Sequence, residues 1–199
     1  MPLKSICIYC GSQNGNNPEF IQAARVLGKA LADNSIRLVY GGGTKGIMGE
    51  VARAVAENNG EIVGIIPQFL LNLEGDGTPP GDLGEVIVTE DMHQRKHMMF
   101  ERADAFVALP GGIGTLEEII EIMTWGQLGR HNKPMAFLNV DGFWNPVIEL
   151  IDHMNKSGFI HTIERVRPLV IESPEQVVST IVEAAEATRS AAETNISKM

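Results

Sequence analysis

Short apolar runs alternate with longer helix-forming segments along the sequence, and this alternation restricts the fold more than any other feature. Strands that are separated by helices pair in parallel, and a parallel sheet needs helices on both faces. The sequence therefore predicts an α/β fold, a Rossmann-like doubly wound parallel sheet of about six or seven strands with helices on both faces. We expect the strands at Lys4–Tyr9, Ile36–Tyr40, Glu61–Ile66, Glu85–Thr89, Ala105–Leu109, Met135–Asn139 and, as a last short run, Leu169–Ile171.

The segments between these runs carry apolar residues at helical spacing. A long irregular stretch, residues 68–84, interrupts the pattern, and a loop of this length in a compact domain is typical of a lid, a binding loop or disorder. We predict one Rossmann-like domain over residues 1–188 and a disordered tail over residues 189–199. The expected helices are Pro18–Asp33, Ile47–Asn58, Met92–Ala103, Leu116–Leu128, Phe143–Lys156 and Pro174–Thr188.

The amino-acid composition limits the classes of molecule that this protein is expected to bind. The 199 residues are enough for one sizeable core, and the net charge of −9 argues against nucleic acid or an anionic membrane as the main partner. A phosphate-bearing ligand must then be held by local donors. Because no apolar run reaches membrane-spanning length and the N-terminus lacks the apolar core of a signal peptide, we expect a cytoplasmic protein.

Cys7 and Cys10 form a Cys-x-x-Cys pair, a spacing that elsewhere indicates redox or metal chemistry. Here the pair lies on the first predicted strand, where three residues span roughly 10 Å and the side chains point to opposite faces. We therefore interpret both as ordinary buried cysteines.

The stretch Pro110-Gly-Gly-Ile-Gly-Thr-Leu-Glu-Glu118 lies between a predicted strand and a predicted helix. Bare glycine backbone at the positive end of a helix dipole is an anion site, and phosphate is its usual guest. Two interpretations of the glutamates stay open. Thr115-x-x-Glu118 fits a helix capping box, or one glutamate faces the sugar of the ligand and does acid–base work there.

A second glycine loop, Gly41-x-Gly43-x-x-Gly46, matches the dinucleotide fingerprint. The next predicted strand ends without the acidic residue that such a site needs, and no Gly-Lys-Ser/Thr sequence follows either loop, so NAD and P-loop interpretations are the weaker ones. All of the glycine-rich and charged loops fall at the carboxyl ends of the predicted strands, where ligands of open α/β sheets bind.

The helix that starts at Met92 opens on the same edge. Arg95 and Lys96 form a solvated face on one interpretation, and on the other they bind a phosphate or carboxylate. His93 and His97 lie four residues apart, but no third ligand accompanies them, and we predict no metal site.

Three motifs together, Gly41-Gly42-Gly43-x-x-Gly46-x-Met48-Gly49, Met92-His93-x-Arg95-Lys96 and Pro110-Gly111-Gly112-x-Gly114-Thr115-x-x-Glu118, resemble those of the LONELY GUY family over about Ser5 to Val178. Members are cytokinin riboside 5′-monophosphate phosphoribohydrolases, often labelled "lysine decarboxylase-like". The resemblance implies that Arg95 and Glu118 are catalytic. It also implies substrate-binding roles for Glu74, Lys96, Gly111, Gly112, Ile113, Gly114, Thr115, Leu116, Glu117 and Thr124. Further candidates on the same edge are Gly11, Ser12, Gly42, Gly43 and Met92.

The resemblance implies hydrolysis of the N-glycosidic bond, which gives a free base and ribose 5-phosphate without a metal or redox cofactor. It also implies a homodimer with sites near the subunit contact. Two alternatives stay open: a general purine nucleoside monophosphate hydrolase that acts on AMP, and a nucleotide-binding module without turnover. Met98, Met99 and Trp125 are candidates for a prenyl pocket, although core packing suits each of them better.

Overall fold

A computed structural model describes residues 3–79, 81–160 and 167–196 of the chain. The strands are β1 (Ser5–Tyr9), β2 (Arg37–Tyr40), β3 (Ile62–Pro67), β4 (Glu85–Thr89), β5 (Ala105–Ala108), β6 (Met135–Leu138) and β7 (Leu169–Ile171). The helices are α1 (Pro18–Asp33), α2 (Gly46–Glu57), α3 (Met92–Arg102), α4 (Ile113–Gln127), α5 (Asn145–Lys156) and α7 (Val177–Ile196), with short 3₁₀ turns η1 (Gln68–Leu70), η2 (Val140–Gly142) and η3 (Pro174–Gln176). Every predicted strand and helix is present.

Two boundaries differ from the predictions in an informative way. Helix α4 begins at Ile113, three residues before the expected Leu116. Helix α7 continues to Ile196 instead of ending near Thr188, so residues 189–196, which we expected to form a disordered tail, extend this helix. Residues 197–199 lie outside the described part of the chain.

The seven strands form one sheet in the order β4-β3-β2-β1-β5-β6-β7, and every neighbouring pair is parallel. This confirms the doubly wound α/β prediction. The chain first builds outward from β1 to β4 and then returns to the other side of β1 as β5, with Tyr9 opposite Ala108. The topological switch point, where ligands of such sheets bind, therefore lies between β1 and β5.

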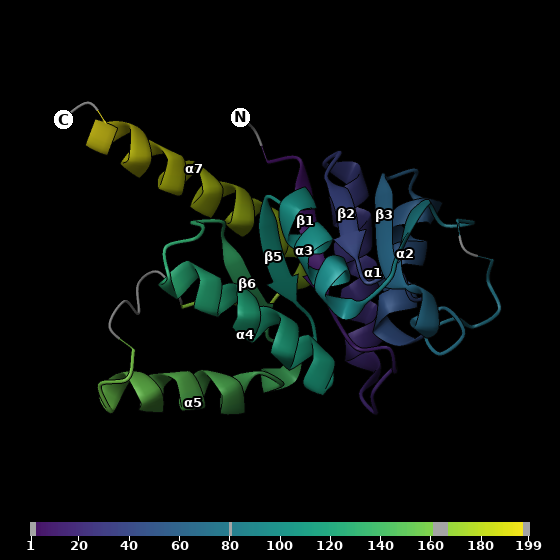
Figure 1. The fold of residues 1–199 in the computed structure, drawn as a ribbon, viewed down its shortest axis with the longest axis horizontal. Helices are drawn as coiled ribbons and strands as arrows, with labels where there is room; N and C mark the ends of the chain where they lie inside the picture. The colour runs from purple at the N-terminus through teal and green to yellow at the C-terminus, as the bar shows by residue number, and fades with distance from the viewer. Residues whose placement is uncertain (1–2, 80, 161–166, 197–199) are drawn as a thin grey trace.

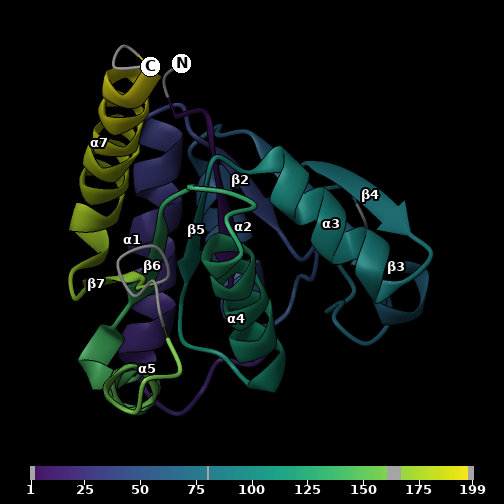
Figure 2. The same ribbon diagram turned by 60° about the vertical axis from the view of Figure 1, so that its left-hand side comes forward.

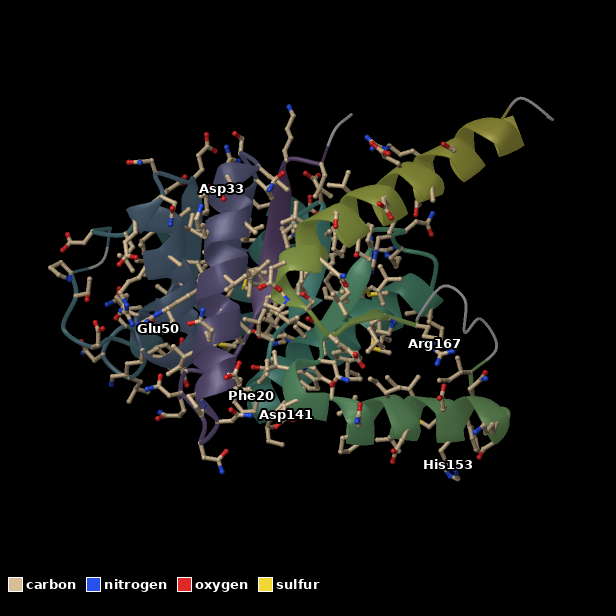
Figure 3. All side chains as sticks on the ribbon, turned by 180° about the vertical axis from the view of Figure 1, so that it is seen from behind. Phe20, Asp33, Glu50, Asp141, His153 and Arg167 are labelled. Atoms are coloured by element: carbon tan, nitrogen blue, oxygen red, sulfur yellow. The ribbon has the colours of Figure 1, made fainter. Side chains whose placement is uncertain are left out.

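Helices cover the sheet in two layers (Figures 1 and 2). Apolar residues of α1, α2 and α7 pack with the side chains of one sheet face, and those of α3, α4 and α5 pack with the other. The view from behind in Figure 3 shows α1 lying across its face of the sheet, with Phe20 at one end and Asp33 at the other. Both faces are buried, which explains why the strands read as nearly continuous apolar runs.

Cys7 and Cys10 are free and buried, as predicted. Cys7 packs in the core on the α4 side and Cys10 in the core on the α1 side. None of the described helices combines the length and the apolar character that a membrane crossing requires.

Candidate active site

A cavity of about 480 Å³ opens at the switch point between β1 and β5. Its walls come from five segments that are distant in the sequence: the end of β1, the β2–α2 region, the loop after β3, the start of α3 and the start of α4. The lining residues are Ile8, Cys10, Gly11, Ser12, Gly41, Met48, Phe69, Leu70, Glu74, Met92, Arg95, Gly112, Ile113, Gly114, Thr115, Glu117 and Glu118.

The loops after β1 and β5 touch each other at the floor of this cavity. The Gly11 N–H donates to the Pro110 carbonyl at 3.1 Å, and the Gly11 carbonyl accepts from the Met48 N–H at 3.1 Å. A Cβ on Gly111 would overlap the Thr115 side chain and lie 2.8 Å from the Gly11 nitrogen. Gly111 is thus required by packing, because the two loops approach through its bare backbone.

The first turn of α4 differs from the capping-box interpretation. Gly112 is the N-cap and provides no side-chain cap, and the first turn contains no acidic residue. Thr115 lies inside the helix and is buried, while Glu117 and Glu118 follow in the second turn. The capping-box prediction is therefore wrong, and Glu118 has no part in starting the helix.

The backbone N–H groups of Ile113, Gly114 and Thr115 form the free end of this helix. Within the described residues, the first backbone hydrogen bond across the start of α4 runs from the Leu116 N–H to the Gly112 carbonyl, at 3.1 Å. First-turn N–H groups point out of the helix end and carry its positive dipole. Since these three residues line the cavity, the helix end faces it as an anion site.

Gly112 and Gly114 have no structural reason to be glycine. A Cβ on either residue would meet no protein atom within 4 Å, and neither residue has a positive φ. Gly114 lies within the helix, where glycine costs roughly 1 kcal/mol relative to alanine. Bare backbone at these two positions leaves space in the cavity for a ligand to approach the N–H groups.

Arg95 is buried on α3, with 4% of its surface exposed, so the solvated-face interpretation is wrong for this residue. Its Nε donates to the Ile65 carbonyl at 3.2 Å and its Nη2 to the Gly41 carbonyl at 2.9 Å. The same Nη2 lies 3.4 Å from Glu74 Oε2. A Cβ on Gly41 would overlap the guanidinium. Two strand-end carbonyls and one glycine thus fix the arginine at the cavity.

The long loop after β3 returns to the β2–α2 loop and brings Glu74 into the site. The Glu74 carbonyl accepts from the Thr44 and Lys45 N–H groups at 2.9 and 3.1 Å. Farther along, Asp76 accepts from Thr44 Oγ1 at 2.7 Å and from Arg53 Nη1 at 3.2 Å. Hydrogen bonds from Thr78 and then from Thr44 hold the pKa of Asp76 well below its usual range, and the bonds from Thr44 and Arg53 anchor the loop. The residues bridged are far apart in sequence, which local patterns do not report.

Glu118 is a half-buried carboxyl at the cavity wall. Its burial raises its pKa from 4.5 to about 7, with the charges of Glu117 and Glu74 adding to the rise and those of Arg95 and Lys96 opposing it. Burial also raises the pKa of Glu74, although Arg95 opposes this. The cavity thus holds a carboxyl that exchanges its proton near neutral pH, a property typical of catalytic acids and bases.

Several predicted binding residues take other positions in this structure. The Lys96 ammonium donates to Glu117 Oε1 at 2.6 Å and to Glu121 Oε1 at 3.1 Å, and it does not line the cavity. Thr124 is exposed on α4 and donates to the Ile120 carbonyl at 2.8 Å. Leu116 packs against the core. The roles predicted for these residues stay predictions.

The further candidates from the sequence fall into two groups, those that line the cavity and those that do not. Gly11, Ser12 and Met92 line the cavity, whereas Gly42 and Gly43 do not. Gly42 has a φ of +78°, and a Cβ on Gly43 would lie 3.0 Å from the Glu74 Cβ, so both serve the path of the loop.

Six lining residues were absent from the predicted site. Position at the end of a strand was a usable signal for Cys10 and Gly41, since those loops were expected at the ligand edge. Nothing local indicated Phe69 or Leu70 in the irregular loop. The full set is Ile8, Cys10, Gly41, Met48, Phe69 and Leu70.

The residues considered for other roles lie outside the cavity. His93 and His97 are exposed on α3, and the described residues include no group of three or more His, Cys, Asp or Glu side chains that could hold a metal ion. Met99 is fully buried in the core, and the Trp125 ring packs edge-on against Phe100 at 4.8 Å between centroids. Core packing is therefore the role of Met99 and Trp125.

The fold and the cavity define a class: a Rossmann-like α/β protein with a helix N-terminus, a buried arginine and a glutamate at the cavity of its switch point. The profile of the family described as "possible lysine decarboxylase" matches residues 48–181. The chain belongs to this family. Proteins that are similar to it include cytokinin riboside 5′-monophosphate phosphoribohydrolases.

Two relatives from Oryza sativa subsp. japonica show the likeness. A "probable cytokinin riboside 5′-monophosphate phosphoribohydrolase LOG4" is 45% identical over 184 residues, 92% of this chain and 79% of that protein. The "cytokinin riboside 5′-monophosphate phosphoribohydrolase LOG" is 47% identical over 171 residues, 86% of this chain and 69% of that protein.

A solved structure supports the fold alone. The molybdenum cofactor binding protein from the phototrophic bacterium Rippkaea orientalis matches with a TM-score of 0.65 at 21% identity, covering 91% of this chain and 96% of that one.

Proposed function

We propose that this protein hydrolyses the N-glycosidic bond of cytokinin riboside 5′-monophosphates and releases the free base and ribose 5-phosphate. The observation that carries the proposal is the first two turns of α4. Two groups of these turns lie on the same cavity, beside a buried arginine: the free N–H groups of the helix N-terminus and a carboxyl with a pKa of about 7. The relatives at 45% and 47% identity bear the name of this activity.

The 5′-phosphate of the substrate binds the N–H groups of Ile113, Gly114 and Thr115. The carboxyl of Glu118 then lies one helical turn farther on, about 4.5 Å along the axis from Thr115. A ribose that extends from the phosphate along this helix therefore meets Glu118. The helix sets both groups on one rigid element, which is what orienting a substrate for reaction requires.

Breaking the bond between C1′ and the base leaves positive charge on the sugar, as in glycoside hydrolysis. The bonding electron pair leaves with the base, which takes up one proton from the solvent and departs as the neutral free base. Ionised Glu118 stabilises the charged sugar and accepts a proton from the water whose oxygen bonds to C1′. Arg95 orients the carboxylates and the substrate around this centre, fixed by the carbonyls of Ile65 and Gly41.

The family description names a decarboxylase, but the cavity favours hydrolysis. Decarboxylation of an amino acid through pyridoxal phosphate needs a lysine that forms a Schiff base with it. Among the described residues no lysine lines the cavity, and the nearby Lys96 is bonded to Glu117 and Glu121.

Three finer points complete the proposal. AMP is an accepted but slower substrate, since the phosphate and ribose contacts do not depend on the base. The protein acts as a homodimer with its sites near the subunit contact, which two exposed apolar residues at the cavity support: Phe69 is 57% and Ile113 82% exposed. The location is cytoplasmic.

The test is to incubate the purified protein with isopentenyladenosine 5′-monophosphate and with AMP, and to follow free base and ribose 5-phosphate by chromatography. We expect both products, faster from the prenylated substrate. Release from AMP alone would indicate a general nucleotide hydrolase, and binding without release would indicate a nucleotide-binding module. Near wild-type rates for Glu118→Gln or Arg95→Ala, with Glu19→Gln as the surface control, would refute the assigned roles.

A further inference from the structure

A second cavity, of about 430 Å³, lies at the amino ends of β1, β5 and β6, whereas the candidate active site lies at the carboxyl ends of the strands. The turn between α4 and β6 forms one wall, and the second half of α7 forms another. Figure 1 shows this turn passing beside α7. Three cationic side chains line the cavity: Arg130 and Lys133 from the turn, and Arg189 from α7.

None of the three cations forms an ion pair with a carboxylate in the described part of the chain. Elsewhere on this acidic protein, cations such as Arg25, Arg37 and Arg53 are paired with glutamates at 2.6 to 2.8 Å. A chain with a net charge of −9 has acidic side chains in excess. Three cations without such a partner at one cavity therefore form a local positive patch, which favours binding of an anion.

Backbone and ring contacts hold the turn in place. Gly129 has a φ of +72°, and the Arg130 N–H closes the helix end by donating to the Trp125 carbonyl at 2.9 Å. His131 accepts from the Lys133 N–H at Nδ1, 3.1 Å, so its Nε2 carries the proton that faces the Ile122 carbonyl at 2.9 Å. This neutral ring leaves the positive charge of the wall to Arg130 and Lys133.

The Lys133 ammonium is positioned but not saturated. It donates to the Phe100 carbonyl at 2.8 Å and lies 4.0 Å from the centre of the Phe100 ring. An ammonium has three donors, so donors remain for a ligand. On α7, Arg189 uses its Nε for the Ala185 carbonyl at 3.3 Å, which leaves its terminal nitrogens available.

Asp104 is the one acidic residue that lines this cavity among those described. Its Oδ2 accepts from the Lys4 N–H at 2.8 Å, the Ser5 N–H at 3.0 Å and the Ser5 hydroxyl at 3.2 Å. That oxygen is thus committed to the start of β1. Glu101 and Asp104 both act on Lys133 through their charges, but Glu101 does not line the cavity, and three lining cations outnumber one lining carboxylate.

We propose that this cavity is a second anion site, and that it binds the phosphate group of a small phosphorylated molecule through Arg130, Lys133 and Arg189. Two guanidinium forks and an ammonium suit the several oxygens of a phosphate. The volume falls within the roughly 300–1,000 Å³ of small-molecule sites. Occupation links the second half of α7 to the turn that ends α4, the helix whose other end carries the candidate active site.

The test follows backbone amide resonances while the whole protein is titrated with inorganic phosphate, then with ribose 5-phosphate, at constant ionic strength set by chloride. Amides 129–133 report on the proposed site and amides 112–115 on the candidate active site. We expect saturable shifts at both. The double variant Arg130→Gln/Arg189→Gln weakens binding at 129–133 by about tenfold or more, since two of the three charged donors are removed. Its response at 112–115 stays unchanged.

The matched control is Lys156→Gln, which removes one exposed charge on α5 and should leave both responses as in the wild type. If the double variant fails to fold, the single variants Arg130→Lys and Arg189→Lys replace it. They keep the charge, and we expect each to bind with an affinity between those of the wild type and a variant without the charge. Absence of shifts at 129–133, equal shifts with chloride alone, or undiminished shifts in the double variant would each overturn the proposal. Saturation with ribose 5-phosphate but not with inorganic phosphate would assign the site to sugar phosphates, and the reverse to free phosphate.

Discussion

The raised pKa of Glu118 implies that this residue destabilises the folded protein at neutral and alkaline pH. Its pKa rises from 4.5 to about 7 on folding, so between these values the folded state holds a proton that the unfolded state has lost. Stability then falls as pH rises, by about 1.4 kcal/mol per pH unit. Replacing Glu118 by glutamine, which has the same shape and no charge, should therefore stabilise the protein by about 3 kcal/mol at pH values above 7.

The gain should vanish below the unfolded-state pKa, where both side chains are neutral. For a chain of this length, about 3 kcal/mol corresponds to a rise in Tm of roughly 6–12 °C. The assay is thermal or urea unfolding of wild type and Glu118→Gln at pH 8 and at pH 4.5. We expect the variant to be more stable at pH 8, nearly equal at pH 4.5, and inactive at both.

Glu186→Gln is the matched control, because Glu186 is exposed on α7 and its loss should change stability little at either pH. If Glu118→Gln is no more stable than wild type at pH 8, burial does not raise the pKa of Glu118 as argued. An equal gain at both pH values would assign the effect to packing instead of ionisation.

Three further predictions concern activity. The rate kcat/KM should rise with pH through about 7 as Glu118 ionises, and Glu117→Gln, which removes a charge that raises this pKa, should move the rise to lower pH. Gly114→Ala should fold as well as wild type, because its Cβ meets no protein atom within 4 Å, yet raise KM for nucleotide by about tenfold or more by crowding the phosphate. Phe69→Ser should lower kcat/KM for the prenylated substrate several-fold and leave AMP nearly unchanged, since Phe69 supplies exposed apolar surface at the cavity; steady-state kinetics measures all three.

For each of these three predictions, one result would contradict the reasoning. The phosphate of the substrate titrates identically with both enzymes, so an unshifted pH profile in Glu117→Gln would count against Glu118 as the titrating group. Gly111→Ala, whose Cβ would overlap Thr115, should lose stability, and a Gly114→Ala variant that loses as much would remove the argument for a ligand at the helix end. Leu128→Ser, at a still more exposed apolar site outside the cavity, should not change substrate preference; if it does, Phe69 has no special role.

Much of the fold was predictable because each strand is buried on both faces and each helix on one. Such burial leaves uninterrupted apolar runs and helical apolar spacing in the sequence. The position of β5 beside β1 is a tertiary choice, but the glycine loops at the ends of both strands indicated the edge where the ligand site lies.

The start of α4 was misplaced because local patterns treat Gly-Ile-Gly as loop. Glycine is a poor helix former, so the periodic pattern seemed to begin at Leu116, with Thr115 as its cap. In the structure Thr115 is buried against Gly111, and the helix includes Gly114 at a cost in propensity. Sites of this kind, where the sequence contradicts its local preference, are expected to be functional.

The position of Glu74 had no local signal, because its backbone carbonyl is held by the distant Thr44 and Lys45 N–H groups and its carboxylate contacts Arg95, 21 positions later. Hydrophobicity alone also gave no local signal for an apolar subsite, and core packing was the better prediction for Met98 and Met99. Met98 and Met99 lie next to the Arg-Lys pair in sequence, yet the apolar residues on the cavity include Phe69 and Met92.

The burial of Arg95 explains how a carboxyl beside a guanidinium still keeps a raised pKa. Two of its donors are engaged by the carbonyls of Ile65 and Gly41, so the guanidinium is shared among several acceptors. Its charge lowers the pKa of both Glu74 and Glu118, but by less than burial raises them. This balance depends on Gly41, since any Cβ there would displace the guanidinium from its two carbonyls. A glycine that resembles part of a dinucleotide fingerprint is thus explained by the arginine, and through it by the acid–base chemistry at Glu118.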